Sequence, residues 1–367
     1  MVTTKEDRRR LAGRMIVCGF DGTSVTAELK EVLREVQPAG LILFKRNVES
    51  PEQVFELIRE VKSLPSEYPL MFSVDQEGGH VARIKEPATL WPAMASLGAI
   101  NDTTLTYRVA SALAREIRAI GFDVNFSPVV DVNTNPDNPV IGSRSFGAVA
   151  DLVGTHGRAF YRGLHESGVG ACAKHFPGHG DTDLDSHFDL PVIHHSLERL
   201  RRIDWPPFRE LVVDGVGAIM SAHVLVEELD DALPGTLSQK TLSHLRNEIG
   251  FEGVIVSDDV EMKALSERFS VSDIALKGAK AGIDLFLACH KPVVQMELYR
   301  ALIHGMEQKQ LRDDDLLKSE KRLHAWLKRF VKPSGSREEL NRWVGCPEHR
   351  VLAEEVEIRF SERAALA

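Results

Sequence analysis

The chain has 367 residues, of which 43% are hydrophobic and 27% charged, an ordinary composition for a globular protein. It carries 45 basic and 54 acidic residues, a net charge of −9, which argues against nucleic-acid binding because phosphate contacts need clustered Lys and Arg. The first ten residues, MVTTKEDRRR, are too charged for a signal peptide, and no apolar run approaches the ~18–20 residues that span a bilayer. The cysteines form no CxxC pair, which indicates small core residues in a reducing compartment. They are Cys18, Cys172, Cys289 and Cys346. We therefore expect a cytoplasmic protein without nucleic-acid or membrane partners.

Eight short apolar runs recur along the chain, and amphipathic helical patterns separate them. The predicted strands are Met15–Phe20, Gly40–Phe44, Leu70–Val74, Val124–Val130, Gly170–His175, Gly217–Ala222, Gly253–Ser257 and Asp284–Cys289. The predicted helices are Val25–Val36, Pro51–Leu64, Thr104–Ile120, Asp151–Ser167, Leu197–Asp214, Ser238–Ile249, Ser272–Ala281 and Pro292–Gln308. This alternation predicts an α/β fold, a (β/α)8 TIM-type barrel with a short helical C-terminal extension. The alternative is a doubly wound open sheet, but the first predicted strand is followed by GFDGT, which lacks the GxGxxG spacing.

The last part of the chain has a different character. A helix is predicted near Asp314–Phe330, and a Pro- and Ser-containing cluster follows at Lys332–Ser336. The remainder is too short to hold a core of its own. We therefore expect a catalytic barrel domain over residues 1–335 and a helical extension over residues 336–367.

The stretch KHFPGHGDTDLDSH, from Lys174 to His187, is the most polar loop that follows a predicted strand. It contains one Lys, three His and three Asp among turn-forming residues. Other predicted strands also end in ionisable groups, which a barrel gathers at one rim. These groups are Asp75, Asp131, His223, Asp258 and Asp259. The set as a whole predicts an active site.

Four motifs carry a resemblance to a known family. In chain order they are DQEGGHVAR, IGSRSFG, KHFPGHGDTDLDSH and VSDDVEM. Over about residues 11–335 the chain resembles glycoside hydrolase family 3, and more narrowly its bacterial cytoplasmic β-N-acetylglucosaminidases (β-hexosaminidases) of cell-wall recycling. The resemblance implies a glycosidase without a metal or other cofactor.

The resemblance places the catalytic groups on two motifs. It implies that Asp258 is the nucleophile that forms a covalent glycosyl-enzyme intermediate. Consecutive strand residues point to opposite faces, so only one of Asp258 and Asp259 is expected to face the pocket. The resemblance further implies that His187 is the general acid and base and that Asp185 orients it. An imidazole with an ordinary pKa near ~6.5 can do both tasks near neutral pH.

The substrate-binding residues also follow from the resemblance. The positions that match are Asp75, Arg83, Arg144, Lys174 and His175, whose charged groups suit hydrogen bonding to sugar hydroxyls. The family usually reads DQEGGR, whereas this chain has His80 at the sixth position. That difference predicts an altered affinity or pH range if this position holds Asp75 or its loop.

The other histidines carry weaker expectations. His179 is expected to be a loop residue, His194 and His195 to be surface or loop residues, and His223 to orient a neighbouring group. A metal-dependent barrel hydrolase remains an alternative, because His175, His179, His187 and His223 with Asp258 could in principle ligate zinc.

The leading hypothesis is a retaining exo-glycosidase that releases terminal β-N-acetylglucosamine from cell-wall muropeptide fragments. Its expected partner is an N-acetylglucosamine-containing carbohydrate, and we expect a monomer or weak homodimer. Three further alternatives remain open from sequence: a β-N-acetylglucosaminide phosphorylase, a broader β-glycosidase and a non-catalytic sugar-binding module.

Overall fold

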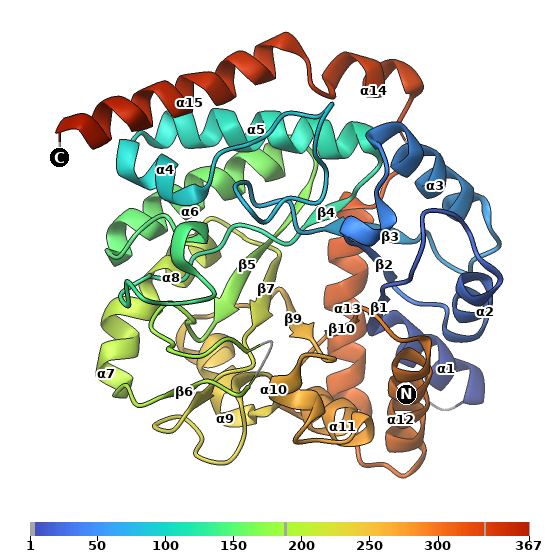
Figure 1. Cartoon of the computed structure of the whole chain (residues 1–367). Coiled ribbons are helices and arrows are strands. Elements are labelled where there is room, and N and C mark those ends of the chain that lie inside the picture. The colour runs from blue at the N-terminus through green and yellow to red at the C-terminus, as the bar shows by residue number, and fades with distance from the viewer. Residues whose placement is uncertain (1–3, 187–188, 334, 367) are drawn as a thin grey trace.

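The computed structural model describes residues 4–186, 189–333 and 335–366, which form a closed barrel with helices around it (Figure 1). The strand order is β1-β10-β9-β7-β5-β4-β3-β2, and all of these pairs are parallel. The strands are β1 (Ile16–Cys18), β2 (Gly40–Leu43), β3 (Met71–Val74), β4 (Val124–Asn125), β5 (Gly170–Phe176), β7 (Ala218–Ser221), β9 (Val254–Asp259) and β10 (Leu285–Ala288). The TIM-type barrel is confirmed, and the open sheet is excluded because the strand order closes on itself.

The helices include all of those predicted and several more. They are α1 (Lys5–Arg14), α2 (Ala27–Val36), α3 (Pro51–Ser63), α4 (Met94–Ile100), α5 (Thr103–Ile120), α6 (Ala150–Glu166), α7 (Leu197–Arg199), α8 (Pro206–Val213), α9 (Gln239–Ser243), α10 (Lys263–Ser266), α11 (Val271–Ala281), α12 (Pro292–Glu307), α13 (Asp313–Phe330), α14 (Arg337–Trp343) and α15 (Pro347–Leu366). The short helices α1, α4 and α10 and a two-stranded sheet of β6 (Val192–Ile193) and β8 (Leu225–Val226) were not predicted. Short loop elements carry too little periodicity to be seen in sequence.

Prolines lie at two of the differences from the predicted elements, whereas the predicted helix Ser238–Ile249 ends as an α-helix at Ser243 and continues as a π-helical turn over His244–Glu248. Strand β4 ends at Asn125 rather than Val130, because Pro128 has no N–H to continue the ladder, which resumes at the bridge between Val129 and Lys174. The predicted helix Leu197–Asp214 is divided by a π-helical turn over Leu200–Asp204. It restarts at Pro206, a residue suited to the first turn of a helix.

Helix α13 closes the end of the barrel at which the strands begin. Its buried Trp326 and Phe330 pack with the apolar side chains of the barrel interior. Small residues make room for them: a Cβ on Gly217 would lie 2.6 Å from the Trp326 ring, and one on Gly170 would lie 3.1 Å from the Phe330 ring. The opposite end, where the strands finish, is the end at which TIM barrels bind their ligands.

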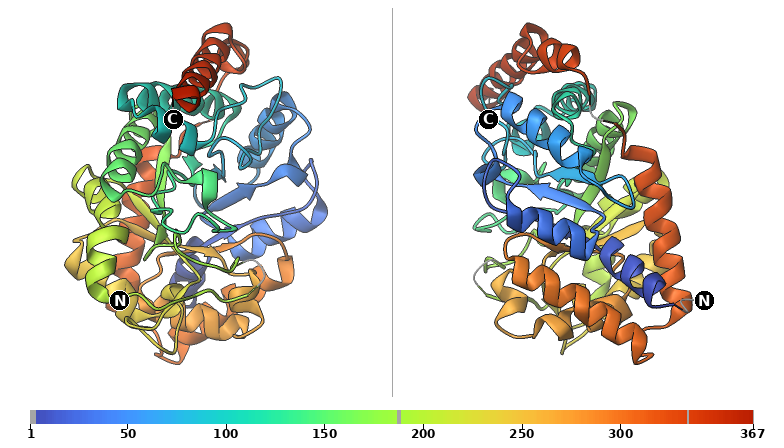
Figure 2. Two further views of the ribbon diagram at one scale, coloured as in Figure 1. Left: turned by 60° about the vertical axis from the view of Figure 1, so that its left-hand side comes forward. Right: turned by 90° about the vertical axis from the view of Figure 1, so that its right-hand side faces the viewer.

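The C-terminal helices α14 and α15 lie across α4 and α5 on the outside of the barrel (Figures 1 and 2). Leu340 and Val356 are buried in this contact, so the extension packs on its own chain. The domain boundary at residue 335 stays a prediction. All four cysteines are buried and free, and no described helix is both long and apolar enough to cross a membrane.

Candidate active site

A cavity of about 190 Å³ lies at the ends of the strands. It is lined by every predicted substrate-binding residue and by the predicted nucleophile: Asp75, Arg83, Arg144, Lys174, His175 and Asp258. Positions up to 183 residues apart in the sequence thus meet in one small space, as the barrel topology predicts.

Asp75 follows β3, and two cations contact its carboxylate. Its Oδ1 lies 2.8 Å from Nζ of Lys174, and its Oδ2 lies 3.6 Å from Nη2 of Arg83. Lys174 is almost fully buried at the end of β5. Burial by itself lowers the pKa of Lys174, but the carboxylates of Asp75 and Glu77 outweigh it and raise this pKa. The ammonium therefore stays charged at the wall of the cavity.

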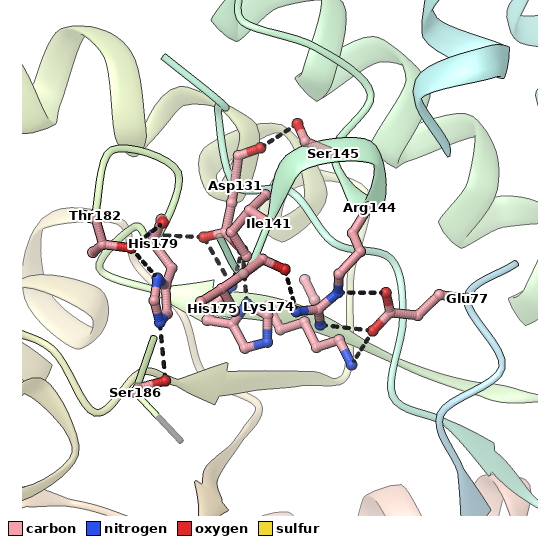
Figure 3. A network of polar contacts seen from close by, with 12 residues as sticks. Glu77, Asp131, Ile141, Arg144, Ser145, Lys174, His175, His179, Thr182 and Ser186 are labelled. Carbon is pink, nitrogen blue, oxygen red and sulfur yellow. Dashed lines mark hydrogen bonds and ion pairs between the residues drawn. The ribbon is translucent and has the colours of Figure 1, made fainter. Parts of the chain in front are cut away.

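Glu77 also lines the cavity, although it was not among the residues predicted from sequence. It is buried, and Arg144 donates to both of its oxygens at 2.9 Å while Lys174 lies 2.6 Å from Oε1 (Figure 3). Burial opposes its ionisation, but the two cations bring the pKa of Glu77 well below its usual range. A signal was available, because Glu77 lies two residues after Asp75 in the DQEGG motif.

Asp131 holds His175, which lies in β5, and His179, which lies in the loop after β5. His175 bonds to its Oδ2 through Nδ1 at 2.7 Å, and the backbone N–H of His179 donates to Oδ1 at 2.8 Å (Figure 3). Asp131 is fully buried; burial opposes ionisation, but the neighbouring His175 lowers the pKa of Asp131. Because Nδ1 of His175 is held by this carboxylate, the orientation of its ring in the cavity is set.

Asp258 lies at the end of β9, and its Oδ1 accepts the backbone N–H of Asp259 at 2.8 Å. Burial raises the pKa of Asp258, but His175, His223 and this hydrogen bond together bring the pKa down to about 2. The carboxylate is therefore ionised across the physiological range, as a nucleophile requires.

The expectation that only one of the paired aspartates faces the cavity was wrong, because Asp259 also lines it. The Asp259 carboxylate, however, is held by contacts with other residues of the protein. Oδ1 accepts the backbone N–H groups of Glu261 and Cys289 at 3.1 and 3.2 Å, and Oδ2 lies 3.2 Å from Nε2 of His290. Asp259 thus takes the loop-capping role, which leaves Asp258 as the candidate nucleophile.

His223 orients the backbone beside Asp258. Its Nε2 lies 2.9 Å from the carbonyl oxygen of Asp259, so this nitrogen carries the proton, and Nδ1 lies 2.8 Å from the Thr236 hydroxyl. Burial lowers the pKa of His223. This fits the expectation of an orienting group.

The loop after β5 reaches the cavity through His179 and Ser186. Nε2 of His179 lies 3.1 Å from the Ser186 hydroxyl, and Nδ1 lies 2.7 Å from the Thr182 hydroxyl (Figure 3). Burial lowers the pKa of His179 to about 4, so the ring is neutral. Asp185 is half-buried, whereas His187 lies outside the described residues, so the predicted Asp185–His187 pair stays a prediction.

His80, His194 and His195 are not among the residues that line the cavity. His80, which replaces the usual Arg, is exposed and does not line the cavity; Lys174 and Arg83 hold Asp75 instead. His194 lies at the surface as expected, but His195 is largely covered and bonds to Asp181 at 2.6 Å. His195 lies in the loop between β6 and α7, as expected of a surface or loop residue, and its contact joins two segments 14 residues apart that only the folded loop brings together.

Across the described parts of the chain, no group of three or more His, Cys, Asp or Glu side chains is arranged to hold a metal ion. His175, His179 and His223 each have a ring nitrogen in a hydrogen bond to protein oxygen. The arrangement therefore presents an ionised carboxylate opposite charged hydrogen-bonding groups, which suits attack on a sugar.

Comparisons with known proteins agree with this chemistry. Residues 10–325 match the family described as "Glycosyl hydrolase family 3 N terminal domain". "Beta-hexosaminidase A" of Pseudoalteromonas piscicida is 34% identical over 92% of this chain, which spans only 61% of that relative's length. The structure of a glycoside hydrolase family 3 β-N-acetylglucosaminidase from Paenibacillus sp. superposes with a TM-score of 0.92 at 37% identity, over 96% of this chain and 68% of that one.

A third similar protein is close to this chain in length. NagZ from Neisseria gonorrhoeae, solved in complex with N-trifluoroacetyl-D-glucosamine, gives a TM-score of 0.79 at 31% identity. The match covers 95% of this chain and 98% of that one. From the matched motifs, the barrel and these relatives together, the chain belongs to glycosyl hydrolase family 3.

Proposed function

We propose that the chain is a β-N-acetylhexosaminidase, a retaining exo-glycosidase that removes terminal non-reducing β-N-acetylglucosamine. The observation that carries the proposal is the ionised carboxylate of Asp258 in one cavity with the Lys174–Asp75 pair. The small volume, about 190 Å³, supports binding of a single terminal sugar unit rather than a stretch of polymer.

The reaction proceeds in two steps. Asp258 attacks the anomeric carbon while His187, oriented by Asp185, donates a proton to the leaving oxygen, so that a glycosyl–Asp258 ester forms. His187 then takes a proton from water, the water oxygen attacks the anomeric carbon, and the bond to Asp258 breaks. Asp75 accepts hydrogen bonds from the sugar hydroxyls, and Arg83, Lys174 and His175 also hydrogen-bond to them. Arg144 acts through Glu77, which places Lys174.

The substrate class comes from the relatives named as hexosaminidases and N-acetylglucosaminidases. Within that class we propose cell-wall muropeptide fragments handled in the cytoplasm during peptidoglycan recycling.

The test is release of 4-nitrophenol from 4-nitrophenyl β-N-acetylglucosaminide by the wild type and by Asp258→Ala. The wild type is expected to turn over, and the variant to lose at least about 10³-fold in kcat. Addition of azide should restore turnover in the variant and yield the α-glycosyl azide, because azide enters where the carboxylate stood. Asp231→Ala, an exposed aspartate, is the matched control and should keep full activity.

Adding EDTA or inorganic phosphate to the assay distinguishes the proposed glycosidase from a metal-dependent hydrolase and from a phosphorylase. EDTA should leave the activity unchanged, whereas a metal-dependent hydrolase would lose it. Inorganic phosphate should not accelerate turnover or yield a sugar phosphate. Turnover that persists in Asp258→Ala would place the nucleophile elsewhere, and no turnover under any condition would contradict the proposal.

A further inference from the structure

Asp181 lies in the loop after β5, and its carboxylate receives two short hydrogen bonds from outside that loop. Thr134 donates from Oγ1 to Oδ1 at 2.6 Å, and Nε2 of His195 lies 2.6 Å from Oδ2. Arg199 adds a third contact, with Nη2 at 3.5 Å from Oδ2. The side chains of Asp181, His195 and Arg199 are only 21–23% exposed, so solvent screens these contacts little.

Arg199 also contacts Asp204, which lies beside the start of the loop. Its Nη1 donates to Asp204 at 3.0 Å, and its Nη2 donates to the Thr134 hydroxyl at 3.1 Å. The Asp204 side chain lies against Gly178, where an added Cβ would come within 3.0 Å of it. The first half of the loop therefore rests on the segment from His195 to Asp204.

The same loop reaches the cavity on its other side. Its backbone is fixed by Asn138, which donates to the carbonyl oxygen of His179 at 2.9 Å, and His179 in turn bonds to Ser186. Ser186 lines the cavity and directly precedes the proposed acid and base, His187. Asp181 and Ser186 thus lie five residues apart in one loop, which is held from outside at Asp181 and borders the cavity at Ser186.

His194 offers a natural comparison within the same dipeptide. Its Nδ1 lies 2.7 Å from Oε2 of Glu227, a distance close to that of the His195–Asp181 pair. The side chains of His194 and Glu227 are 72% and 51% exposed, and neither contacts the catalytic loop through this pair. Exposed ion pairs of this kind contribute ~0–1 kcal/mol.

We propose that His195 is a positioning residue, which holds Asp181 and thereby sets the place of the acid and base motif relative to Asp258. The inference rests on the proposed function, because it concerns the protonation step of that reaction. It concerns the loop after β5 and not the sugar-binding groups, of which Lys174 and His175 lie within β5 and the others follow different strands.

The test compares two substrates with the same sugar, whose leaving groups differ in whether they need to be protonated. Phenol is a poor leaving group and requires protonation, whereas 2,4-dinitrophenol leaves without it. In His195→Ala, kcat/KM for phenyl β-N-acetylglucosaminide is expected to fall about tenfold or more, since misplacement by ~1 Å can cost ~10²-fold. For the 2,4-dinitrophenyl substrate kcat/KM should stay within about twofold.

Three variants complete the design. His195→Gln should recover most of the loss, because its amide N–H reaches the position of Nε2 and donates to Asp181. Thr134→Val removes the other short bond to Asp181, gives the same selective loss, and provides the test if His195→Ala does not fold. His194→Ala should behave as the wild type with both substrates.

Equal losses with both substrates, or no loss in His195→Ala and Thr134→Val, would overturn the positioning role. These outcomes remain distinct from failure of the proposed function. If the proposed function failed, the wild type itself would hydrolyse neither substrate, or Asp258→Ala would remain active.

Discussion

Glu77 and Arg144 form a two-point ion pair at the wall of the cavity, with Nε to Oε2 and Nη2 to Oε1 both at 2.9 Å. The residues are 67 positions apart and come from the loops after β3 and β4. The parallel geometry of a guanidinium and a carboxylate makes this pair directional as well as strong. Through its second contact, with Lys174, the pair fixes the cation that also holds Asp75.

Glu77→Gln should therefore impair substrate binding. The amide cannot neutralise Arg144 and Lys174, so two buried cations lose their common partner, at a cost of about 3–5 kcal/mol in folding free energy. We expect KM for 4-nitrophenyl β-N-acetylglucosaminide to rise about tenfold, with a lower Tm. Glu86→Gln, an exposed glutamate in the same loop, is the control; an unchanged KM in Glu77→Gln would contradict the role.

Asp204 should make stability depend on pH. Burial raises its pKa to about 7 from an ordinary value near ~3.8, so the folded state keeps the proton longer than the unfolded state. The stability that protonated Asp204 contributes is fully present below pH ~4. It is lost as the pH rises to ~7, which lowers the free energy of unfolding by about 4 kcal/mol in total. Asp204→Asn should remove this loss, so its advantage over the wild type in free energy of unfolding grows between pH 4 and 7.5.

Urea unfolding of both proteins at several pH values measures this difference. Asp231→Asn, at an exposed position, should show no such trend. A difference between wild type and Asp204→Asn that is constant with pH would mean that Asp204 titrates normally in the folded state.

Glu116 should anchor the C-terminal extension. Its buried carboxylate accepts from Thr89 at its backbone N–H and hydroxyl, from the Gly345 N–H, and from Nδ1 of His349. Glu116→Gln keeps one oxygen for the three donors to Oε1 but sets an amide N–H against the buried backbone N–H of Thr89, and we expect a loss of about 3 kcal/mol in unfolding free energy. Glu355→Gln, which breaks the exposed pair with Arg108, should cost less than about 1 kcal/mol. Similar losses in the two variants would show that burial at Glu116 is unimportant.

Trp326 should matter for stability but not for binding. It is buried at the closed end of the barrel, away from the cavity. Trp326→Ala should cost about 3–5 kcal/mol through lost contacts and a cavity. KM at a temperature where the variant stays folded should remain within about twofold of the wild type, and a larger shift in KM would show that the two ends of the barrel are coupled.

Much of the barrel and of the site was predictable from sequence because both depend on local signals. Apolar runs alternating with helical periodicity predicted all eight barrel strands, and the motifs predicted the residues that meet in the cavity. The boundaries of β4 and of the helix after Leu197 were less predictable, since prolines there interrupt the backbone hydrogen bonds.

The sequence by itself determined the fold class, the family and the positions of Asp75, Lys174 and Asp258 at strand ends, because strand periodicity and motif order are properties of the chain. Only the tertiary structure decided which charges share a partner. The pairing of Glu77 with Arg144 and of Asp181 with His195 depends on how loops from different strands fold over one another. Such side-chain contacts between distant segments leave no periodic pattern in the sequence, because their geometry exists only once the barrel has closed.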